Sequence, residues 1–231
     1  MTTPTAILKH AARPLALAAA VVALVASAGL TRGQDRFTPG EFDFYVLALS
    51  WSPSFCAAAE ERSPNRVPQQ QCGGRPYSFV VHGLWPQFER GFPQHCQDPP
   101  PLDPDIVSSM LDLMPARGLV HHEWETHGTC SGLSARDYFD TVRKARAAVA
   151  IPAEFERLKQ YRMVAPQDVE EAFVKANAGA RAAGVTVTCS GRRLSEVRVC
   201  LTKDLQFREC PSLRKGACRR DQVVMPPVRG G

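Results

Sequence analysis

Histidine is concentrated in two short segments of the chain. The first is His82-Gly83-Leu84-Trp85-Pro86, and the second runs from His122 to Cys130. Four of the six histidines lie in or directly beside these segments: His82, His121, His122 and His127. Imidazole exchanges protons near neutral pH because its ordinary pKa is about 6.5. A single histidine more often has a structural or surface role, whereas this concentration indicates proton-transfer chemistry.

A zinc site is the first alternative, because His-Glu followed by another histidine resembles the helix of zinc proteases. That motif places its histidines four residues apart, which is about 40° around a helix. His122 and His127 are five residues apart, so they diverge by about 140°. His121 is six residues from His127 and fails as well. The segment therefore predicts neither a metal site nor a cofactor.

Glu123 and His127 are four residues apart and fall on one face of a helix. A carboxylate one turn away from an imidazole can hold its orientation or stabilise its protonated form. An ordinary surface pair is the alternative. Trp124 and the Gly128-Thr129-Cys130 ending are unusual choices for a plain solvated face, which favours a functional pair.

Four segments that resemble strands would carry or support these residues. Residues 41–51 form an aromatic and β-branched run, and residues 77–81 lead directly into His82. Residues 185–189 and 194–201 alternate apolar and polar side chains, as half-buried strands do. Residues 57–76 contain several prolines and glycines and are predicted to be a loop.

Helices are predicted in the middle of the chain. Asp103 and Pro104 suit a helix start, and this helix is expected to run through Met114. Another helix contains His122 to His127, Ser134 caps a third, and a fourth follows Pro166. No internal repeat or linker is visible. The pattern predicts one α+β domain.

The N-terminus has the composition of a secretory signal peptide. Lys9 and Arg13 precede an apolar run over 15–25, which ends in Ala26-Ser27-Ala28. A membrane anchor is the alternative, but the run is short and rich in alanine. We expect cleavage after Ala28, a catalytic domain over 29–231 and a loose tail over 220–231. Removing 1–28 takes away two positive charges, so the net charge falls from +5 to +3.

Eight cysteines follow the signal segment, and no two have the C-x-x-C spacing of zinc or redox motifs: Cys56, Cys72, Cys96, Cys130, Cys189, Cys200, Cys210 and Cys218. In an oxidising compartment an even number of cysteines predicts disulfides, here four. Their spacing leaves all 105 pairings open.

The two histidine segments resemble the active-site segments of the ribonuclease T2 family, in its bacterial, secreted members. The resemblance extends to Leu47-Ala48-Leu49-Ser50-Trp51-Ser52-Pro53-Ser54-Phe55-Cys56, Gly91-Phe92-Pro93-Gln94-His95-Cys96 and Glu196-Val197-Arg198-Val199-Cys200-Leu201. It covers roughly residues 42–210 in the family's order. It implies an α+β fold with a central antiparallel sheet flanked by helices and stapled by disulfides.

The resemblance implies endonucleolytic cleavage of single-stranded RNA through a 2′,3′-cyclic phosphate, without metal. His127 would be the base that takes the 2′-hydroxyl proton and His82 the acid that protonates the leaving oxygen. Glu123 would support the charged phosphorane. His122, Trp85 and Thr126 would contact the substrate, although a plain core role for Trp85 stays open. DNA lacks the attacking hydroxyl and would not be cleaved.

Thr126 departs from the family pattern, which usually has Lys or Arg immediately before the second catalytic histidine. A hydroxyl can donate a hydrogen bond but brings no charge to the phosphorane. Arg117, Arg136 or another basic side chain could compensate for it. The alternative function is therefore a catalytically weak RNA-binding protein on the same fold.

The resemblance also implies the disulfides and the setting of the protein. The expected pairs are Cys96–Cys130, Cys56–Cys72 and a nested Cys189–Cys218 around Cys200–Cys210. We expect a monomer in the periplasm or outside the cell, with no membrane contact after signal cleavage. Trp51, Phe55 and Phe88 are candidates for stacking on the bases of single-stranded RNA.

Overall fold

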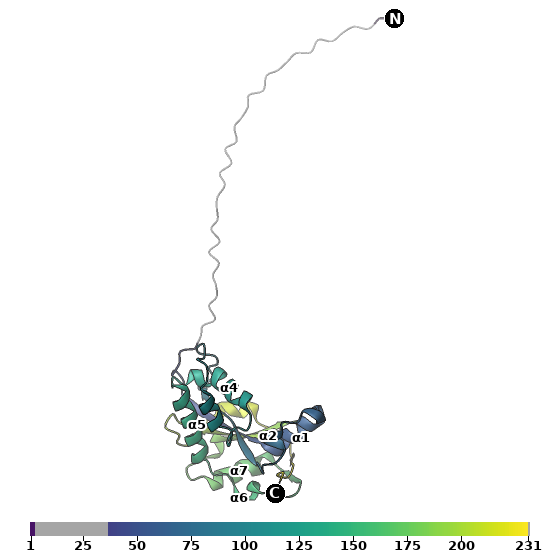
Figure 1. The fold of residues 1–231 in the computed structure, drawn as a ribbon, viewed down its shortest axis with the longest axis vertical. Helices are drawn as coiled ribbons and strands as arrows, with labels where there is room; N and C mark the ends of the chain where they lie inside the picture. The colour runs from purple at the N-terminus through teal and green to yellow at the C-terminus, as the bar shows by residue number, and fades with distance from the viewer. Residues whose placement is uncertain (3–36, 231) are drawn as a thin grey trace. The chain divides into compact units, whose positions relative to one another are not determined.

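A six-stranded sheet forms the centre of the computed structural model (Figure 1), which describes residues 1–2 and 37–230. Residues Asp35–Gly231 form one compact unit. Residues 3–28 of the predicted signal peptide lie outside the described residues. Within the described part of the chain, no helix is long and apolar enough to cross a membrane.

The strands follow the order β2-β1-β5-β6-β3, and β4 also pairs with β5. Their bounds are β1 Phe44–Trp51, β2 Phe79–Gln87, β3 Arg162–Val164, β4 Val185–Ser190, β5 Arg193–Leu201 and β6 Val223–Met225. Every pairing is antiparallel except the short contact of β5 with β6, which is parallel. The predicted α+β fold with a central antiparallel sheet is confirmed, and β6 makes the sheet mixed.

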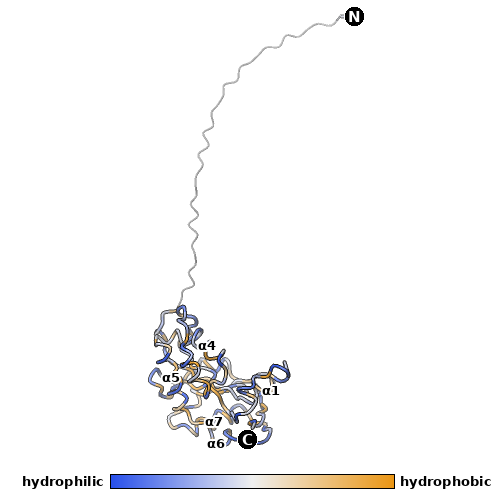
Figure 2. Tube along the Cα trace, in the orientation of Figure 1, coloured by the Kyte–Doolittle hydropathy of each residue, from blue (hydrophilic) through white to orange (hydrophobic). Residues whose placement is uncertain are grey.

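β1 is an internal strand of the sheet, and its side chains are buried on both faces. Tyr45, Leu47 and Leu49 pack into the main core, whereas Phe44 and Val46 pack into a second cluster on the other face. Successive side chains of a strand point to opposite faces, so an uninterrupted apolar run needs cover on both sides. Figure 2 shows these apolar segments gathered in the interior of the domain.

Helices surround the sheet. Their bounds are α1 Ser52–Arg62, α2 Gln69–Cys72, α3 Pro104–Ser109, α4 Arg117–Thr126, α5 Ala135–Ala148, α6 Ala153–Glu156 and α7 Pro166–Ala176, with short 3-10 turns η1 Pro64–Arg66, η2 Gly128–Cys130, η3 Ala182–Gly184 and η4 Pro211–Gly216. Asp103 and Ser134 cap α3 and α5, since their side chains accept from the amides of Asp105 and Asp137. Both predicted caps are confirmed.

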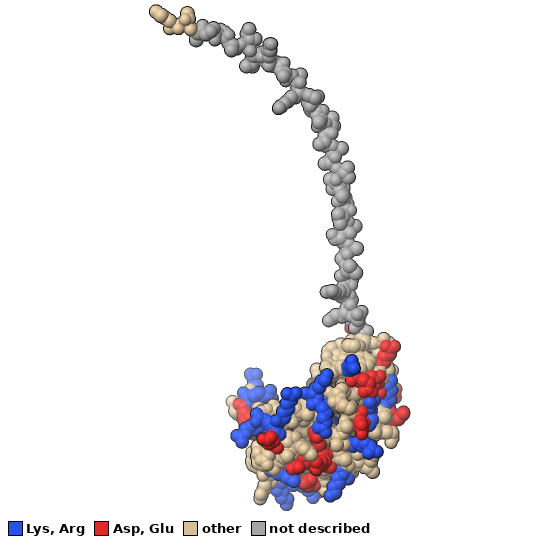
Figure 3. Space-filling model, turned by 180° about the vertical axis from the view of Figure 1, so that it is seen from behind, with Lys and Arg blue, Asp and Glu red and all other residues tan. Residues whose placement is uncertain are grey.

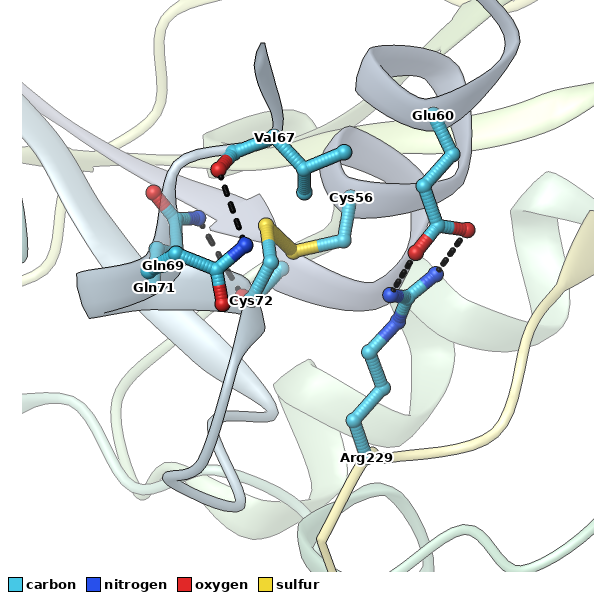
Figure 4. The surroundings of a disulfide bond; sticks show 8 residues. Cys56, Glu60, Val67, Gln69, Gln71, Cys72 and Arg229 are labelled. Atoms are coloured by element: carbon cyan, nitrogen blue, oxygen red, sulfur yellow. Dashed lines mark hydrogen bonds and ion pairs between the residues drawn. A yellow bond between two sulfur atoms is a disulfide. The ribbon is translucent and has the colours of Figure 1, made fainter. Parts of the chain in front are cut away.

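The predicted loop over 57–76 is wrong for most of its length. Residues 57–62 complete α1, and η1 and α2 follow. Pro53 lies in the first turn of α1, where proline is tolerated, and three consecutive alanines favour helix after it. Figure 4 shows the Cys56–Cys72 disulfide joining α1 to α2.

Two further boundaries differ from the predictions. The helix expected through Met114 ends at Ser109 and continues as turns. The loose tail expected over 220–231 is wrong for the described residues, because β6 pairs with β3. The indole of Trp51 donates to Pro226 O at 3.1 Å, and Arg229 forms a bidentate ion pair with Glu60 on α1 (Figure 4).

All four expected disulfide pairs are present. They are Cys56–Cys72, Cys96–Cys130, Cys189–Cys218 and Cys200–Cys210. Cys96–Cys130 joins the irregular segment after β2 to η2, which follows His127 directly. This disulfide therefore connects the loop after the first histidine segment to the end of the second.

Candidate active site

His82 is the extra residue of a β-bulge in β2. Ala48 of β1 pairs with Gly83 and the next residue, Leu49, pairs with Val81, so His82 has no partner on β1. Bulges bend a strand and redirect a side chain, often beside an active site. Because β2 continues to Gln87, the strand is longer than the predicted 77–81. The side chain of His82 is 36% exposed.

The imidazole of His82 lies between two carboxylates. Its Nδ1 is 2.5 Å from Glu196 Oε1, and its Nε2 is 3.7 Å from Glu123 Oε1. Burial lowers the pKa of His82, but the hydrogen bond and charge of Glu196 and the charge of Glu123 outweigh it and raise the pKa above its ordinary value. The geometry favours the protonated form of His82.

Glu123 is 1% exposed and lies on α4 facing β2. Its Oε2 accepts a hydrogen bond of 2.8 Å from Trp85 Nε1, whereas its Oε1 is buried without a hydrogen-bond partner. Burial raises the pKa of Glu123 to about 7, although His82 and Trp85 act in the opposite direction. A carboxylate in this state is a poised acid–base group.

His127 follows the last residue of α4 and caps its C-terminus. Its φ of −119° departs from the usual helical value of about −63°, whereas its ψ of −44° remains helical, at the point where α4 is followed by the 3-10 turn η2. The hydrogen bonds of the described residues join Glu123 to Trp85, and only the backbone amide of His127 donates to Glu123 O. These hydrogen bonds therefore do not include the expected side-chain pairing of Glu123 with His127.

The imidazole of His127 is 9% exposed and in contact with other rings. Its centroid lies 5.5 Å from that of Trp85 and 6.4 Å from that of His122. Nδ1 is buried without a hydrogen-bond partner. Burial and then the charges of His122, His82 and His95 lower the pKa of His127 to about 3. His127 is consequently neutral across the physiological range.

Trp85 lies at the centre of these residues. Its ring centroid is 5.3 Å from that of His82, and the guanidinium carbon of Arg198 lies 5.1 Å from the indole centroid. The indole is half-buried, so it both packs against the histidines and keeps an open surface. The structure thus gives Trp85 a packing role and leaves part of its indole exposed.

His122 and Thr126 form a pair on α4. Thr126 Oγ1 is 3.3 Å from His122 Nδ1, and Thr126 is 3% exposed whereas His122 is exposed. The hydroxyl of Thr126 is thus bonded within the protein, and His122 is the member of the pair that faces solvent. The side chain of His121 is also exposed but takes no part in the hydrogen bonds, ion pairs or ring contacts of the described chain.

Three residues of the site were not identified from the sequence. Glu196 and Arg198 lie two residues apart on β5 and contact His82 and Trp85, respectively. The available signal in the sequence was that these two charged residues alternate with apolar residues in the predicted half-buried strand over 194–201. His95, whose charge acts on His127, has a φ of +50°. Such a conformation is uncommon for residues other than glycine and occurs at functional sites.

The two arginines named from the sequence as substitutes for the cation that Thr126 replaces have their contacts outside the predicted site. Arg117 begins α4 and donates to Ser108 Oγ, and Arg136 lies 4.0 Å from Asp103. Among the described residues, Arg198 is the arginine that contacts a side chain of the predicted site.

A groove of about 600 Å³ adjoins His82 and Glu196. Its lining includes Phe55 and Arg62 of α1 and Arg192 after β4. Phe55 is 39% exposed and can stack on a ligand, whereas Trp51 is wholly buried, so its proposed stacking role is wrong. Phe88 packs on Phe37 and does not line this groove.

Lys and Arg side chains gather over the protruding part of the domain that α1 occupies, as Figure 3 shows from behind. Arg62 and Arg192, which line the groove, are both exposed. A groove with a cationic border suits a polyanion. No group of three or more His, Cys, Asp or Glu side chains in the described ranges is arranged to hold a metal ion.

Comparison with known proteins agrees with this architecture. A model of the Ribonuclease T2 family matches residues 42–210. A protein named "Ribonuclease" from Aeromonas hydrophila is 38% identical over 211 residues, which cover 85% of this chain and 91% of that protein. Trichomaglin, described as a novel S-like ribonuclease, has a similar structure with a TM-score of 0.66 at 23% identity, covering 81% of this chain and 99% of its own.

A second solved structure, RNase NT in complex with 5′-AMP, has a TM-score of 0.58 at 26% identity and covers 81% of this chain and 99% of its own. The family match spans the same residues as the resemblance in the sequence, from β1 to the last cysteine of the Cys200–Cys210 disulfide. It includes both histidine segments and the elements that carry them, β2 for the first and α4 with η2 for the second. The chain therefore belongs to the ribonuclease T2 family.

Proposed function

We propose that this protein is an endoribonuclease that cleaves single-stranded RNA through a 2′,3′-cyclic phosphate, with His82 and His127 as the acid–base pair. The observation that carries the proposal is that two histidines pack against the ring of Trp85 in surroundings that shift their pKa values in opposite directions. Both pack against Trp85, yet the pKa of His82 is raised and that of His127 is lowered to about 3. One is ready to donate a proton and the other to accept one.

The reaction divides between these two histidines. Neutral His127 takes the proton of the ribose 2′-hydroxyl as its oxygen attacks the adjacent phosphorus. Protonated His82 gives its proton to the 5′-oxygen as the phosphorus–oxygen bond breaks. Each transfer contributes roughly 10²–10⁴-fold to the rate. In the hydrolysis of the cyclic phosphate the two roles exchange, since the protonation states of His82 and His127 are by then reversed.

Glu123 and His122 complete the proposed site. Glu123 lies 3.7 Å from His82 Nε2 and supports the charge that develops at the reacting phosphate. His122 is exposed and is oriented by Thr126, so it can bind a phosphate oxygen. Thr126 is itself buried, so it would act on the substrate through His122.

The groove beside His82 is the proposed path of the RNA strand. Phe55 offers a ring for base stacking, which is worth roughly 1–3 kcal/mol per base. Arg62 and Arg192 lie in its lining and can meet the phosphates. DNA would bind without being cleaved, because it has no 2′-hydroxyl to attack the phosphorus.

The proposed location is the periplasm or the exterior of the cell. The apolar N-terminal segment predicts export, and four disulfides are expected where the environment is oxidising. We expect the mature protein to act as a monomer that starts after Ala28.

Cleavage of a labelled single-stranded RNA by the oxidised mature protein in excess chelator tests the mechanism. Wild-type protein is expected to release ends with a 2′,3′-cyclic phosphate, whereas His127→Ala and His82→Ala lose several orders of magnitude in rate. Activity that disappears with chelator and returns with zinc would exclude the proposed mechanism.

An RNA-binding protein with little turnover is the second candidate. The uncharged Thr126 in place of the family's usual cation favours it. Binding of the same RNA without cleavage, by wild type and by His127→Ala alike, would support this candidate. In that case Thr126→Lys is the variant expected to restore cleavage.

A further inference from the structure

Glu196 reaches His82 across the strand that lies between them. β1 separates β5 from β2, and Ser50 of β1 pairs with Glu196 in the sheet register. Serine is small and leaves room for the carboxylate above it, while its hydroxyl donates to Glu196 Oε1 at 3.4 Å. Since His82 is bulged out of the β1–β2 ladder, its Nδ1 meets the same oxygen at 2.5 Å.

Both oxygens of Glu196 are engaged. Oε1 accepts from His82 and Ser50, and Oε2 accepts from Arg198 Nε at 3.0 Å and Nη2 at 2.8 Å. Glu196 is 6% exposed. Burial alone would raise its pKa, but the hydrogen bonds and charges of His82 and Arg198 lower it to about 2. Glu196 is therefore a fixed anion, unlike Glu123.

Arg198 connects this anion to the rest of the site. Its guanidinium bonds to Glu196 and lies over the indole of Trp85, 5.1 Å from the ring centroid. A planar guanidinium can make both contacts at once. Arg198 thus fixes the carboxylate that holds His82 and also packs against the ring that touches both histidines.

We propose that Glu196, held by Arg198, is the positioning residue of His82. The ionised carboxylate accepts a hydrogen bond from Nδ1–H, so the ring orientation is fixed and Nε2 is the nitrogen that delivers and recovers the catalytic proton. A carboxylate on the far nitrogen also stabilises the imidazolium. The inference rests on the proposed function of His82 as the acid and adds the residues that hold it in that role.

Substitution of Glu196 and substitution of Arg198 should shift the pKa of His82 in opposite directions. The groups that face it are Glu196 and Arg198 from β5, Glu123 from α4 and His127 from the end of α4. Removing the Glu196 anion lowers the pKa of His82, whereas removing the Arg198 cation raises it. A purely structural role predicts a loss of stability in both variants and no movement of the pKa of His82.

The test compares Glu196→Gln with Arg198→Met. The descending, alkaline limb of the kcat profile is expected to move down by about 1 pH unit or more in Glu196→Gln and to move upward in Arg198→Met. NMR titration of the His82 ring should move in the same directions. We also expect kcat of Glu196→Gln to fall at least about tenfold, with a smaller change in KM, because orientation of the acid is lost.

Glu170→Gln is the matched control. Glu170 is also 6% exposed, accepts a backbone hydrogen bond from Val187 and pairs with Arg214, but it lies on α7. It should lose stability and leave the pH profile in place. If the profiles and the His82 titration of Glu196→Gln and Arg198→Met coincide with those of wild type, the positioning role is wrong even where stability falls.

Failure of the proposed function gives a different result. If wild-type protein cleaves no RNA, the His82 titration still measures whether Glu196 and Arg198 act on the imidazole in the directions given. If wild type cleaves RNA and only the two shifts are absent, the function stands and the positioning role is excluded.

Discussion

A β-carbon on Gly83 would lie 1.9 Å from Glu123 Oε2 and 2.4 Å from Trp85 Nε1. The hydrogen bond between the carboxylate and the indole therefore passes directly over the bare Cα of Gly83. Glycine is needed in this strand because of that close approach. The relationship explains why Gly follows His82 in the first histidine segment.

Gly83→Ala is expected to reduce kcat by about 10² or more, because Glu123 must move and a small displacement of a catalytic group is costly. RNA cleavage at fixed pH measures this. Gly74→Ala is the control, since no atom lies within 4 Å of the added carbon there. Wild-type activity in Gly83→Ala would mean that the Glu123–Trp85 contact is not needed for catalysis.

Glu123→Gln is expected to stabilise the protein in a pH-dependent manner. The folded-state pKa of Glu123 is raised from 4.5 to about 7. Below pH 4.5 both folded and unfolded states bind the proton, so ionisation carries no penalty. The penalty grows between pH 4.5 and about 7 and then stays at on the order of 3 kcal/mol. Urea unfolding at pH 4 and pH 8 should show a gain only at pH 8. Equal differences at both pH values would contradict the raised pKa of Glu123.

The pH profile of kcat/KM should be bell-shaped with a wide plateau. The rising limb belongs to loss of a proton from His127, whose pKa is lowered to about 3. The falling limb lies above the ordinary histidine value of about 6.5, since the pKa of His82 is raised. Removing the nearby cation in His122→Ala raises the pKa of His127, so the rising limb moves to higher pH. His121→Ala should not move it, and equal effects of both would contradict this assignment.

The Cys96–Cys130 disulfide is expected to affect catalysis as well as stability. It closes 34 residues, and Cys56–Cys72 closes 16; each closure contributes about 3–4 kcal/mol. Replacing the Cys96–Cys130 pair with serines should also lower kcat, because η2 adjoins His127. The matched Cys56–Cys72 replacement should change KM instead, since α1 lines the groove. Kinetics measured at temperatures below the unfolding midpoints of both variants separate the effects on kcat and KM from the loss of stability.

Deletion of residues 220–231 is expected to destabilise the protein by at least about 3 kcal/mol. Val223 and Met225 are wholly buried, and burial of each such side chain is worth roughly 1.5–3 kcal/mol. Arg229→Ala removes only a partly exposed ion pair with Glu60 and should cost less than about 1 kcal/mol. Denaturant midpoints measure both. An unchanged midpoint after the deletion would mean that β6 contributes nothing to the fold.

The sequence by itself determined the fold class, the family and the residues that could exchange protons. Apolar runs such as Phe44–Trp51 show local periodicity, and the motifs around His82 and His127 are contiguous, so both are visible without a structure. The four disulfide pairs came from the family resemblance, because spacing alone could not select among the possible pairings.

The sequence did less well where local signals competed. Prolines and glycines over 57–76 outweighed the alanines of α1, and the three-residue run Val223–Met225 was too short to predict β6. In both places the decisive contribution comes from partners distant in the chain. Arg229 binds Glu60, and β6 pairs with β3, and neither contact leaves a trace in the local pattern.

Only the tertiary structure decided what surrounds each histidine. Helical spacing assigned Glu123 to His127, but the contacts of the described residues join the carboxylate of Glu123 to Trp85 and His82. Glu196 is 114 residues from His82, and only sheet order and a bulge bring them together. A pKa depends on burial and on charges within a few ångströms, and those are properties of the folded chain, which the order of residues alone does not display.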